Sequence, residues 1–186
     1  MFYNNGGFMI DNIKKYCDIV RCSSYENELA IKWLYENELY KKVVGTLREE
    51  LELYVRTFYL LSQTQIEREK ILNNFFKGFK WGITERVMVD FAKNNSGQGW
   101  EEITYKIGCY FIHLTIFHNW SNEDITKFVT NYEKNILINY INQYYNANLN
   151  INSTFDDIIK YSLDIFKKIK DNMEYQLEQL ELNENR

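Results

Sequence analysis

The residues of this chain best suited to acid–base chemistry are His113 and His118, in the segment CYFIHLTIFHNW at 109–120. They are its only two histidines. An imidazole titrates near neutral pH, so one ring can accept a proton while another donates one. Such a pair suits metal-free RNA cleavage, in which one group takes the proton of a ribose 2′-hydroxyl and the other protonates the leaving 5′-oxygen. A nearby cation would stabilise the charge that develops on the phosphate.

The expected helix around these histidines does not bring them together. On a regular helix over 100–118, the two imidazoles point about 140° apart. His118 shares a face with Ile107, and His113 shares the opposite face with Cys109. The rings could converge if the helix ends or distorts near Phe117, or across a dimer. A structural role, with both histidines as packing residues of an apolar helix, is the alternative.

The pattern His113-x4-His118-x-Trp120 resembles the R-x4-6-H signature of HEPN proteins, which is often extended to R-x4-H-x-Y. The resemblance implies a small all-α bundle that forms a homodimer in which two copies of the motif meet in a cleft. It implies a metal-independent ribonuclease of a bacterial defence or stress system, in some cases with an antitoxin-like protein partner. His118 would then be the main acid–base residue, His113 its partner or the phosphate ligand, and Asn119 a polar aid.

One departure from the signature concerns His113, which occupies the place of the motif arginine. An arginine is always charged and can hold a phosphate through two hydrogen bonds, whereas histidine is charged only part of the time near pH 7. Three readings follow: His113 substitutes for the arginine, Arg56 or Arg48 supplies the cation, or the site does not cleave RNA. In the last case the chain would be a non-catalytic HEPN-like module that binds nucleic acid, a nucleotide or a protein partner.

A second segment, FFKGFKW at 75–81, alternates aromatic residues with Lys77 and Lys80. Bases can stack on such rings while lysines meet phosphates. We therefore expect Lys77 and Lys80, together with Arg56 and Trp120, to contact nucleic acid. The competing interpretation is that this segment is a helix end whose rings pack into the core.

Composition limits the classes of function. The formal net charge of −4 argues against a protein that coats long nucleic acid by bulk charge. No signal-peptide pattern or run of about 18 apolar residues is present, so we expect a cytoplasmic protein that does not enter a membrane. The three cysteines complete no zinc set and are expected to be packing thiols, and no phosphate-binding glycine loop occurs. The sequence therefore predicts no metal and no cofactor.

Helical periodicity dominates the chain, and no strand pattern appears. We predict a single all-α domain over 1–186, an up-and-down helical bundle that is HEPN-like, with its core at about 24–182 and frayed ends at 1–8 and 183–186. Ser23 or Ser24 is expected to cap a helix, and Thr64 and Glu67 form a capping-box pattern. The expected helices cover about 9–21, 24–62, 64–77, 84–93, 100–118, 121–145 and 155–182, with loops at 94–99 and 146–154.

Overall fold

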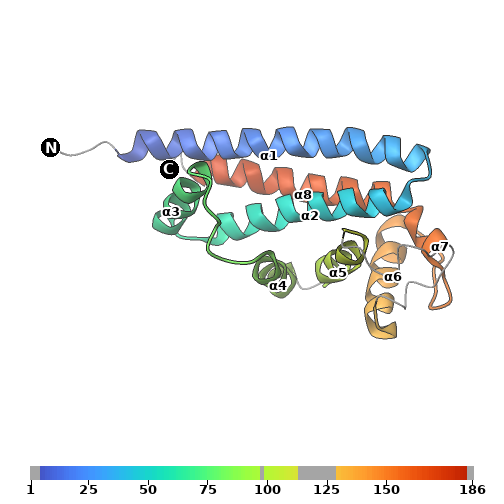
Figure 1. The fold of residues 1–186 in the computed structure, drawn as a ribbon. Helices are drawn as coiled ribbons and strands as arrows, with labels where there is room; N and C mark the ends of the chain where they lie inside the picture. The colour runs from blue at the N-terminus through green and yellow to red at the C-terminus, as the bar shows by residue number, and fades with distance from the viewer. Residues whose placement is uncertain (1–4, 97–98, 113–128, 184–186) are drawn as a thin grey trace.

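The computed structural model describes residues 5–96, 99–112 and 129–183 (Figure 1). This part of the chain is helical and contains no strand, which confirms the all-α prediction. None of its helices is long and apolar enough to cross a lipid bilayer. The helices are α1 (Asn5–Glu36), α2 (Tyr40–Ser62), α3 (Gln65–Phe76), α4 (Glu85–Ser96), α5 (Trp100–Ile112), α6 (Asn131–Tyr145), α7 (Phe155–Ile159) and α8 (Ser162–Asn183).

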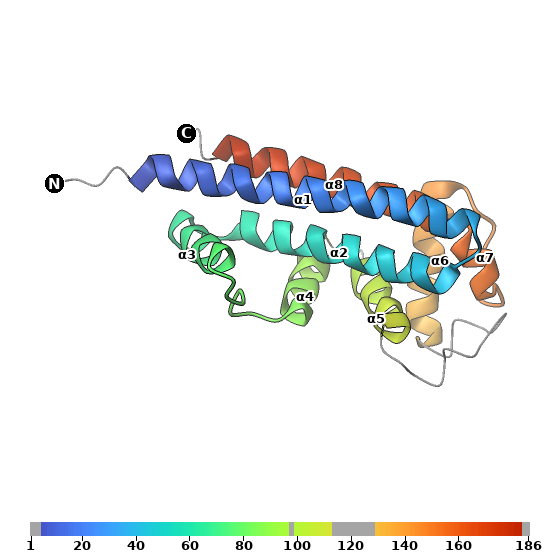
Figure 2. The ribbon, with the colours of Figure 1, turned by 45° about the horizontal axis from the view of Figure 1, so that its top comes forward.

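Three long helices, α1, α2 and α8, lie side by side and form the body of the molecule (Figures 1 and 2). The shorter helix α3 lies near one end of this group. Helices α4 and α5 pack on the side of α2 away from α1, and α6 and α7 lie near the other end. Helix α2 is thus the central element, with α1 and α8 on one side and α4 and α5 on the other.

The core forms where the sequence places apolar residues three and four apart. Leu47, Leu51 and Tyr54 of α2 are buried, and Phe58 and Leu61 pack against them. The predicted apolar face of the C-terminal segment is also confirmed; its buried residues are Phe155, Ile159, Phe166, Ile169, Met173, Leu177 and Leu180. The core additionally includes Ile13, Tyr16, Cys17 and Val20, which precede the range expected to form it.

The N-terminal helices differ from the prediction. Helix α1 runs without interruption through Ser23 and Ser24, so the predicted cap is wrong. Ser24 is buried and donates a hydrogen bond to the Glu50 carboxylate of α2 at 2.6 Å. The predicted helix over 24–62 is also wrong, because the chain turns at 37–39, where Glu38 has a left-handed φ of 57°.

Helix α3 follows the prediction. Thr64 is its N-cap and accepts a hydrogen bond from the Glu67 backbone N–H, as the capping-box pattern predicts. The helix ends at Phe76, and Gly78 adopts a φ of 76°, a conformation that a glycine adopts without strain. The next helix, α4, continues to Ser96 and so extends into the predicted 94–99 loop.

The later helices are shorter than predicted. Thr130 has an extended backbone and caps α6 in a capping box with Glu133, so a helix boundary lies inside the predicted 121–145 helix. The predicted 155–182 helix is divided at Lys160 and Tyr161 into α7 and α8. The prediction for 113–118, at the end of the expected 100–118 helix, lies outside the described residues.

The three cysteines have different environments. Cys17 is buried in the core, as expected of a packing thiol, and Cys109 is half-buried. Cys22 is exposed on α1, so the prediction of a packing role is wrong for that residue.

Candidate functional site

The residues predicted to form the site divide into two groups. His113, His118, Asn119 and Trp120 lie outside the described residues. Helix α5, which ends at Ile112, leads directly into this segment. Arg56, Lys77 and Lys80 lie in the described part of the chain. The contacts that α5 makes near its C-terminal end show which side chains lie beside the start of the histidine segment.

A cluster of four charged side chains connects α2 to α4 on the side that also packs α5. Arg48, Glu52 and Arg56 are spaced four residues apart on α2, and Glu85 lies in the first turn of α4. We call Arg48, Glu52, Arg56 and Glu85 the charged cluster.

Each arginine of the charged cluster contacts both carboxylates. Arg48 donates to Glu52 at 2.9 Å and also to Glu85. Arg56 donates to Glu52 at 2.8 Å and lies 3.3 Å from Glu85. The side chains are 13–28% exposed, so solvent screens these pairs less than it screens pairs on an open surface.

Aromatic rings cover the two guanidinium groups. Arg48 lies over the ring of Tyr105 on α5, with 5.0 Å from its central carbon to the ring centroid. Arg56 lies over the ring of Trp81 at 5.3 Å. Both distances fall within the range of a cation–π interaction, which adds to the ion pairs in holding each side chain in place.

The ion pairs shift the pKa values of Glu52 and Arg48. Burial alone would raise the pKa of Glu52, but its hydrogen bond with Arg48 and the charge of Arg56 lower this pKa below its ordinary value. Burial would likewise lower the pKa of Arg48, but hydrogen bonds with Glu52 and Cys109 and the Glu85 charge raise it. Two arginines face two glutamates, so the formal charges of the charged cluster cancel.

Arg48 lies beside the C-terminal half of α5. A Cβ atom placed on Gly108 would lie only 2.6 Å from the Cβ of Arg48, so α5 approaches α2 very closely at this point. Tyr105, Gly108 and Cys109 of α5 all contact the Arg48 side chain. Arg48 thus lies against the two turns of α5 that precede the histidine segment.

The other basic residues near α4 are also paired. Arg86 and Lys93 both bind Glu102 of α5, at 2.5 and 2.6 Å. The hydrogen bond from Lys93 is the largest influence on the pKa of Glu102, which lies below its ordinary value. These two cations are therefore not a free basic patch.

In the 75–81 segment, some aromatic rings pack into the core and others are exposed. Phe75 and Trp81 pack with Tyr16 in the core, at ring-centroid distances of 5.8 and 6.0 Å from it. Phe79 is 64% exposed, and Lys77 and Lys80 are exposed beside it. Neither lysine forms an ion pair with the described residues. Phe76 is also exposed, so the segment presents two rings and two cations to solvent.

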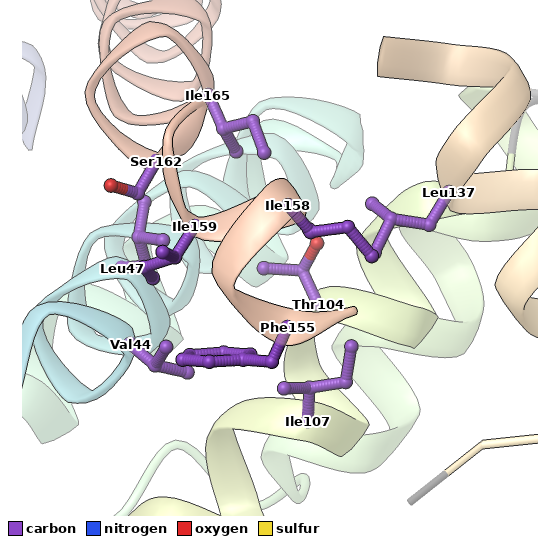
Figure 3. A pocket seen from close by; sticks show the side chains of 10 residues that line it. All are labelled: Val44, Leu47, Thr104, Ile107, Leu137, Phe155, Ile158, Ile159, Ser162 and Ile165. Atoms are coloured by element: carbon purple, nitrogen blue, oxygen red, sulfur yellow. The ribbon is translucent and has the colours of Figure 1, made fainter. Parts of the chain in front are cut away.

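A small cavity near the junction of α7 and α8 differs from the charged cluster in having a mostly apolar lining (Figure 3). Its volume is about 40 Å³. Thr104 and Ser162 are its only polar lining residues, and the buried Ser162 hydroxyl makes no hydrogen bond in the described structure. The remaining lining residues are apolar: Val44, Leu47, Ile107, Leu137, Phe155, Ile158, Ile159 and Ile165. Because no ionisable group lines it, this cavity offers no acid–base chemistry.

Sequence reasoning found part of the charged cluster. Arg56 and Arg48 were identified as cations, but Glu52 and Glu85 were not recognised as their partners. The spacing of Arg48, Glu52 and Arg56 is a readable signal, because residues four apart meet on a helix. Glu85 arrives from another helix and gives no such signal. In the described parts of the chain, no three His, Cys, Asp or Glu side chains gather as a metal site would require.

No protein family, curated protein or solved structure matches the chain.

Proposed function

We propose that this chain is an RNA-directed, HEPN-like protein with metal-independent ribonuclease activity in a bacterial defence or stress system. In this proposal His118 is the main acid–base residue, His113 is its partner, and Asn119 and Trp120 help to position the RNA. Phe79, Lys77 and Lys80 would bind a more distant part of the same strand by stacking and charge.

The observation that carries the proposal is the place of Arg48. The motif arginine is replaced by His113, so cleavage needs a cation from another part of the chain. Arg48 lies against Tyr105 and Gly108 on α5, and His113 is the residue that follows this helix. Of the two arginines of the charged cluster, Arg48 is therefore better placed to supply the missing cation than Arg56.

The partners of Arg48 suit it to this role. Glu52 and Glu85 hold its guanidinium from two sides, and the Tyr105 ring covers one face. A cation fixed before substrate binds has little reorganisation to undergo when charge develops on a phosphate. Its pKa is raised, so it stays charged throughout the pH range in which two histidines exchange protons.

The test is cleavage of mixed RNA by the purified chain in the presence of EDTA. Wild type should cleave, His118→Ala should lose activity, and Arg48→Lys should lose at least about tenfold, because lysine cannot reproduce the two-sided contact. Arg21→Lys is the matched control, since Arg21 also pairs with two glutamates, Glu174 and Glu181, but between α1 and α8. No cleavage by wild type, or equal cleavage by His118→Ala, would overturn the catalytic proposal.

The second candidate is a non-catalytic HEPN-like module that binds nucleic acid, a nucleotide or a protein partner such as an antitoxin-like protein. The neutrality of the charged cluster favours it, because Glu52 and Glu85 offset both arginines before any phosphate arrives. In this case RNA should shift the mobility or melting temperature of the chain without being cleaved. If RNA, DNA and nucleotides all fail to shift either quantity, the partner is a protein.

Glu85→Gln measures how strongly the carboxylates restrain binding. The change gives the charged cluster a net charge of +1, so RNA should bind more tightly. The logarithm of its affinity should also fall more steeply with the logarithm of salt concentration, by up to about 0.7–1 in slope. Glu67→Gln, at an exposed position of α3, is the control for the same change in net charge. Equal effects of the two variants would mean that phosphate does not reach the charged cluster.

A further inference from the structure

Five helices border the cavity near the junction of α7 and α8: α2, α5, α6, α7 and α8 (Figure 3). All ten side chains that line it are buried, and all but Thr104 and Ser162 are hydrocarbon. Four of the lining residues are isoleucines, namely Ile107, Ile158, Ile159 and Ile165. The cavity therefore lies inside the packed core and not on an open surface.

The cavity adjoins the same contact between α2 and α5 as the charged cluster. Leu47 lines the cavity and directly precedes Arg48 on α2. Ile107 also lines it and directly precedes Gly108, the residue of α5 that approaches Arg48. Neighbouring residues of a helix point about 100° apart, so the cavity and the charged cluster adjoin different faces of these two helices. A molecule in the cavity would contact both helices that position Arg48.

Two hydroxyl groups of the lining have no hydrogen-bond partner among the described residues. The Ser162 side chain is 1% exposed, and its oxygen accepts and donates no hydrogen bond there. Thr104 is 8% exposed and likewise forms no hydrogen bond within the described parts of the chain. Figure 3 shows the Thr104 hydroxyl pointing toward Ile158, among the lining side chains, whereas the Ser162 hydroxyl points away from them. A buried hydroxyl without a partner is costly, so the Thr104 hydroxyl favours a molecule that can pair with it.

The size and lining of the cavity decide which molecules fit. Its volume is about 40 Å³. Because a cavity of about 150 Å³ holds benzene, this one has room for about two or three non-hydrogen atoms. No charged side chain lines it, so an ion would be buried without a counter-charge. Water fits poorly, because a buried water makes about three hydrogen bonds, and Thr104 alone among the lining residues directs a polar group inward.

We propose that this cavity binds a neutral aliphatic alcohol of the size of methanol or ethanol. The alkyl part of the alcohol contacts the isoleucine side chains, and its hydroxyl forms a hydrogen bond with the Thr104 hydroxyl. The small number of atoms limits the affinity, so the dissociation constant of ethanol is no lower than about 0.5 mM. Alcohol binding does not depend on RNA cleavage and is measured in the full chain without RNA.

The first test follows the isoleucine δ1-methyl groups of the full chain by NMR during a titration with ethanol. The methyl signals of Ile107, Ile158, Ile159 and Ile165 should shift along one saturation curve. Ile31 is buried on α1 away from the cavity lining, so its methyl signal is the internal control and should not follow that curve. No saturable shift up to about 50 mM ethanol, a hundredfold above the tightest expected dissociation constant, overturns the proposal.

The second test varies the chain length of the alcohol, which separates a site of fixed size from a general effect of alcohol as a solvent. A solvent effect grows with each methylene group, because each adds apolar surface. The cavity instead limits the size of the molecule, and overfilling a packed site is unfavourable. Affinity should therefore be highest for methanol or ethanol and at least about tenfold lower for 1-butanol. An affinity that rises steadily from methanol to 1-butanol overturns the proposal.

The third test removes the hydroxyl with little change of shape. Thr104→Val should weaken ethanol binding at least about fivefold and leave the binding of xenon unchanged, because xenon forms no hydrogen bond. Thr46→Val is the matched control, since Thr46 is also a buried threonine but donates to the Lys42 carbonyl at 3.1 Å and does not line the cavity. Equal ethanol affinity in Thr104→Val and wild type overturns the proposal.

A second variant keeps the proposal testable if Thr104→Val does not fold. Val44→Ile adds one methyl group to the cavity lining and leaves every polar group in place. It should weaken the binding of ethanol and of xenon alike, because both need the volume that the methyl group takes. Ethanol binding that is unaffected by Val44→Ile places the alcohol elsewhere in the molecule and overturns the proposal.

Discussion

Replacing Gly108 by alanine tests the close approach of α5 to α2. The new methyl group would lie 2.6 Å from the Arg48 Cβ and 2.9 Å from its Cγ. Ordinary contact begins at 3.4 Å, so the methyl group is 0.8 Å too close. The Arg48 Cβ is attached to the backbone of α2 and cannot rotate away. One of the two helices has to shift.

Two opposing effects set the size of the change. Alanine is about 1 kcal/mol better than glycine inside a helix, which favours the variant. Overfilling a packed site costs about 1–3 kcal/mol. Because the overlap involves a fixed Cβ and also displaces a side chain with two ion pairs, we expect the upper part of that range. The net loss in the free energy of unfolding is then about 1–2 kcal/mol.

Urea unfolding followed by circular dichroism at one fixed protein concentration measures this loss. Gly45→Ala is the matched control, because Gly45 also lies inside a helix but a Cβ there meets nothing within 4 Å. It should gain up to about 1 kcal/mol, and the melting temperatures of the two variants should move in opposite directions by about 2–4 °C per kcal/mol. If Gly108→Ala proves as stable as Gly45→Ala, α5 does not pack against Arg48 as closely as described.

Three further outcomes follow from other contacts. Thr130→Ala should cost about 1 kcal/mol of unfolding free energy in the same urea assay, because it removes the cap of α6; no loss would mean that the cap is not formed. Burial raises the pKa of Glu50 in the folded state, so its contribution to stability falls as pH rises from its ordinary pKa of 4.5 to the raised value. The stability of Glu50→Gln relative to wild type should therefore increase over that window and then level off in urea melts at several pH values; the same trend for exposed Glu49→Gln would contradict this origin. A thiol reagent should modify exposed Cys22 in the folded protein, whereas Cys17, whose pKa burial raises to about 12, should react only after unfolding, as peptide mass mapping would record.

The sequence predicted the fold best where periodicity and local capping act together. The α8 face from Phe166 to Leu180 and the Thr64 cap both depend on residues within a few turns of one another. The turn at 37–39 was missed because no glycine or proline marks it, and Glu38 adopts a left-handed φ that its residue type rarely takes. Ser24 was misassigned as a cap because its partner, Glu50, is distant in sequence.

In the candidate site, too, the sequence predicted local features but not the contacts between helices. Arg48 and Arg56 are recognisable as cations on one helix, and their spacing from Glu52 follows from helical geometry. The contribution of Glu85 depends on how α4 packs across α2, and the role of Arg48 beside α5 depends on Gly108. These are tertiary contacts, and a single sequence does not encode them in any local pattern. The histidine motif remains a prediction from the sequence.

The charged cluster also constrains which substitutions the chain can accept. Removing one of its four charges leaves a half-buried partner without compensation, so single changes at Arg48, Glu52, Arg56 or Glu85 should each be penalised. Replacing an ion-paired group as a whole by apolar residues of similar volume can be neutral or stabilising. The effects of substitutions at the four positions should therefore be strongly non-additive. A library that randomises all four together should yield folded variants whose single-substitution intermediates do not fold.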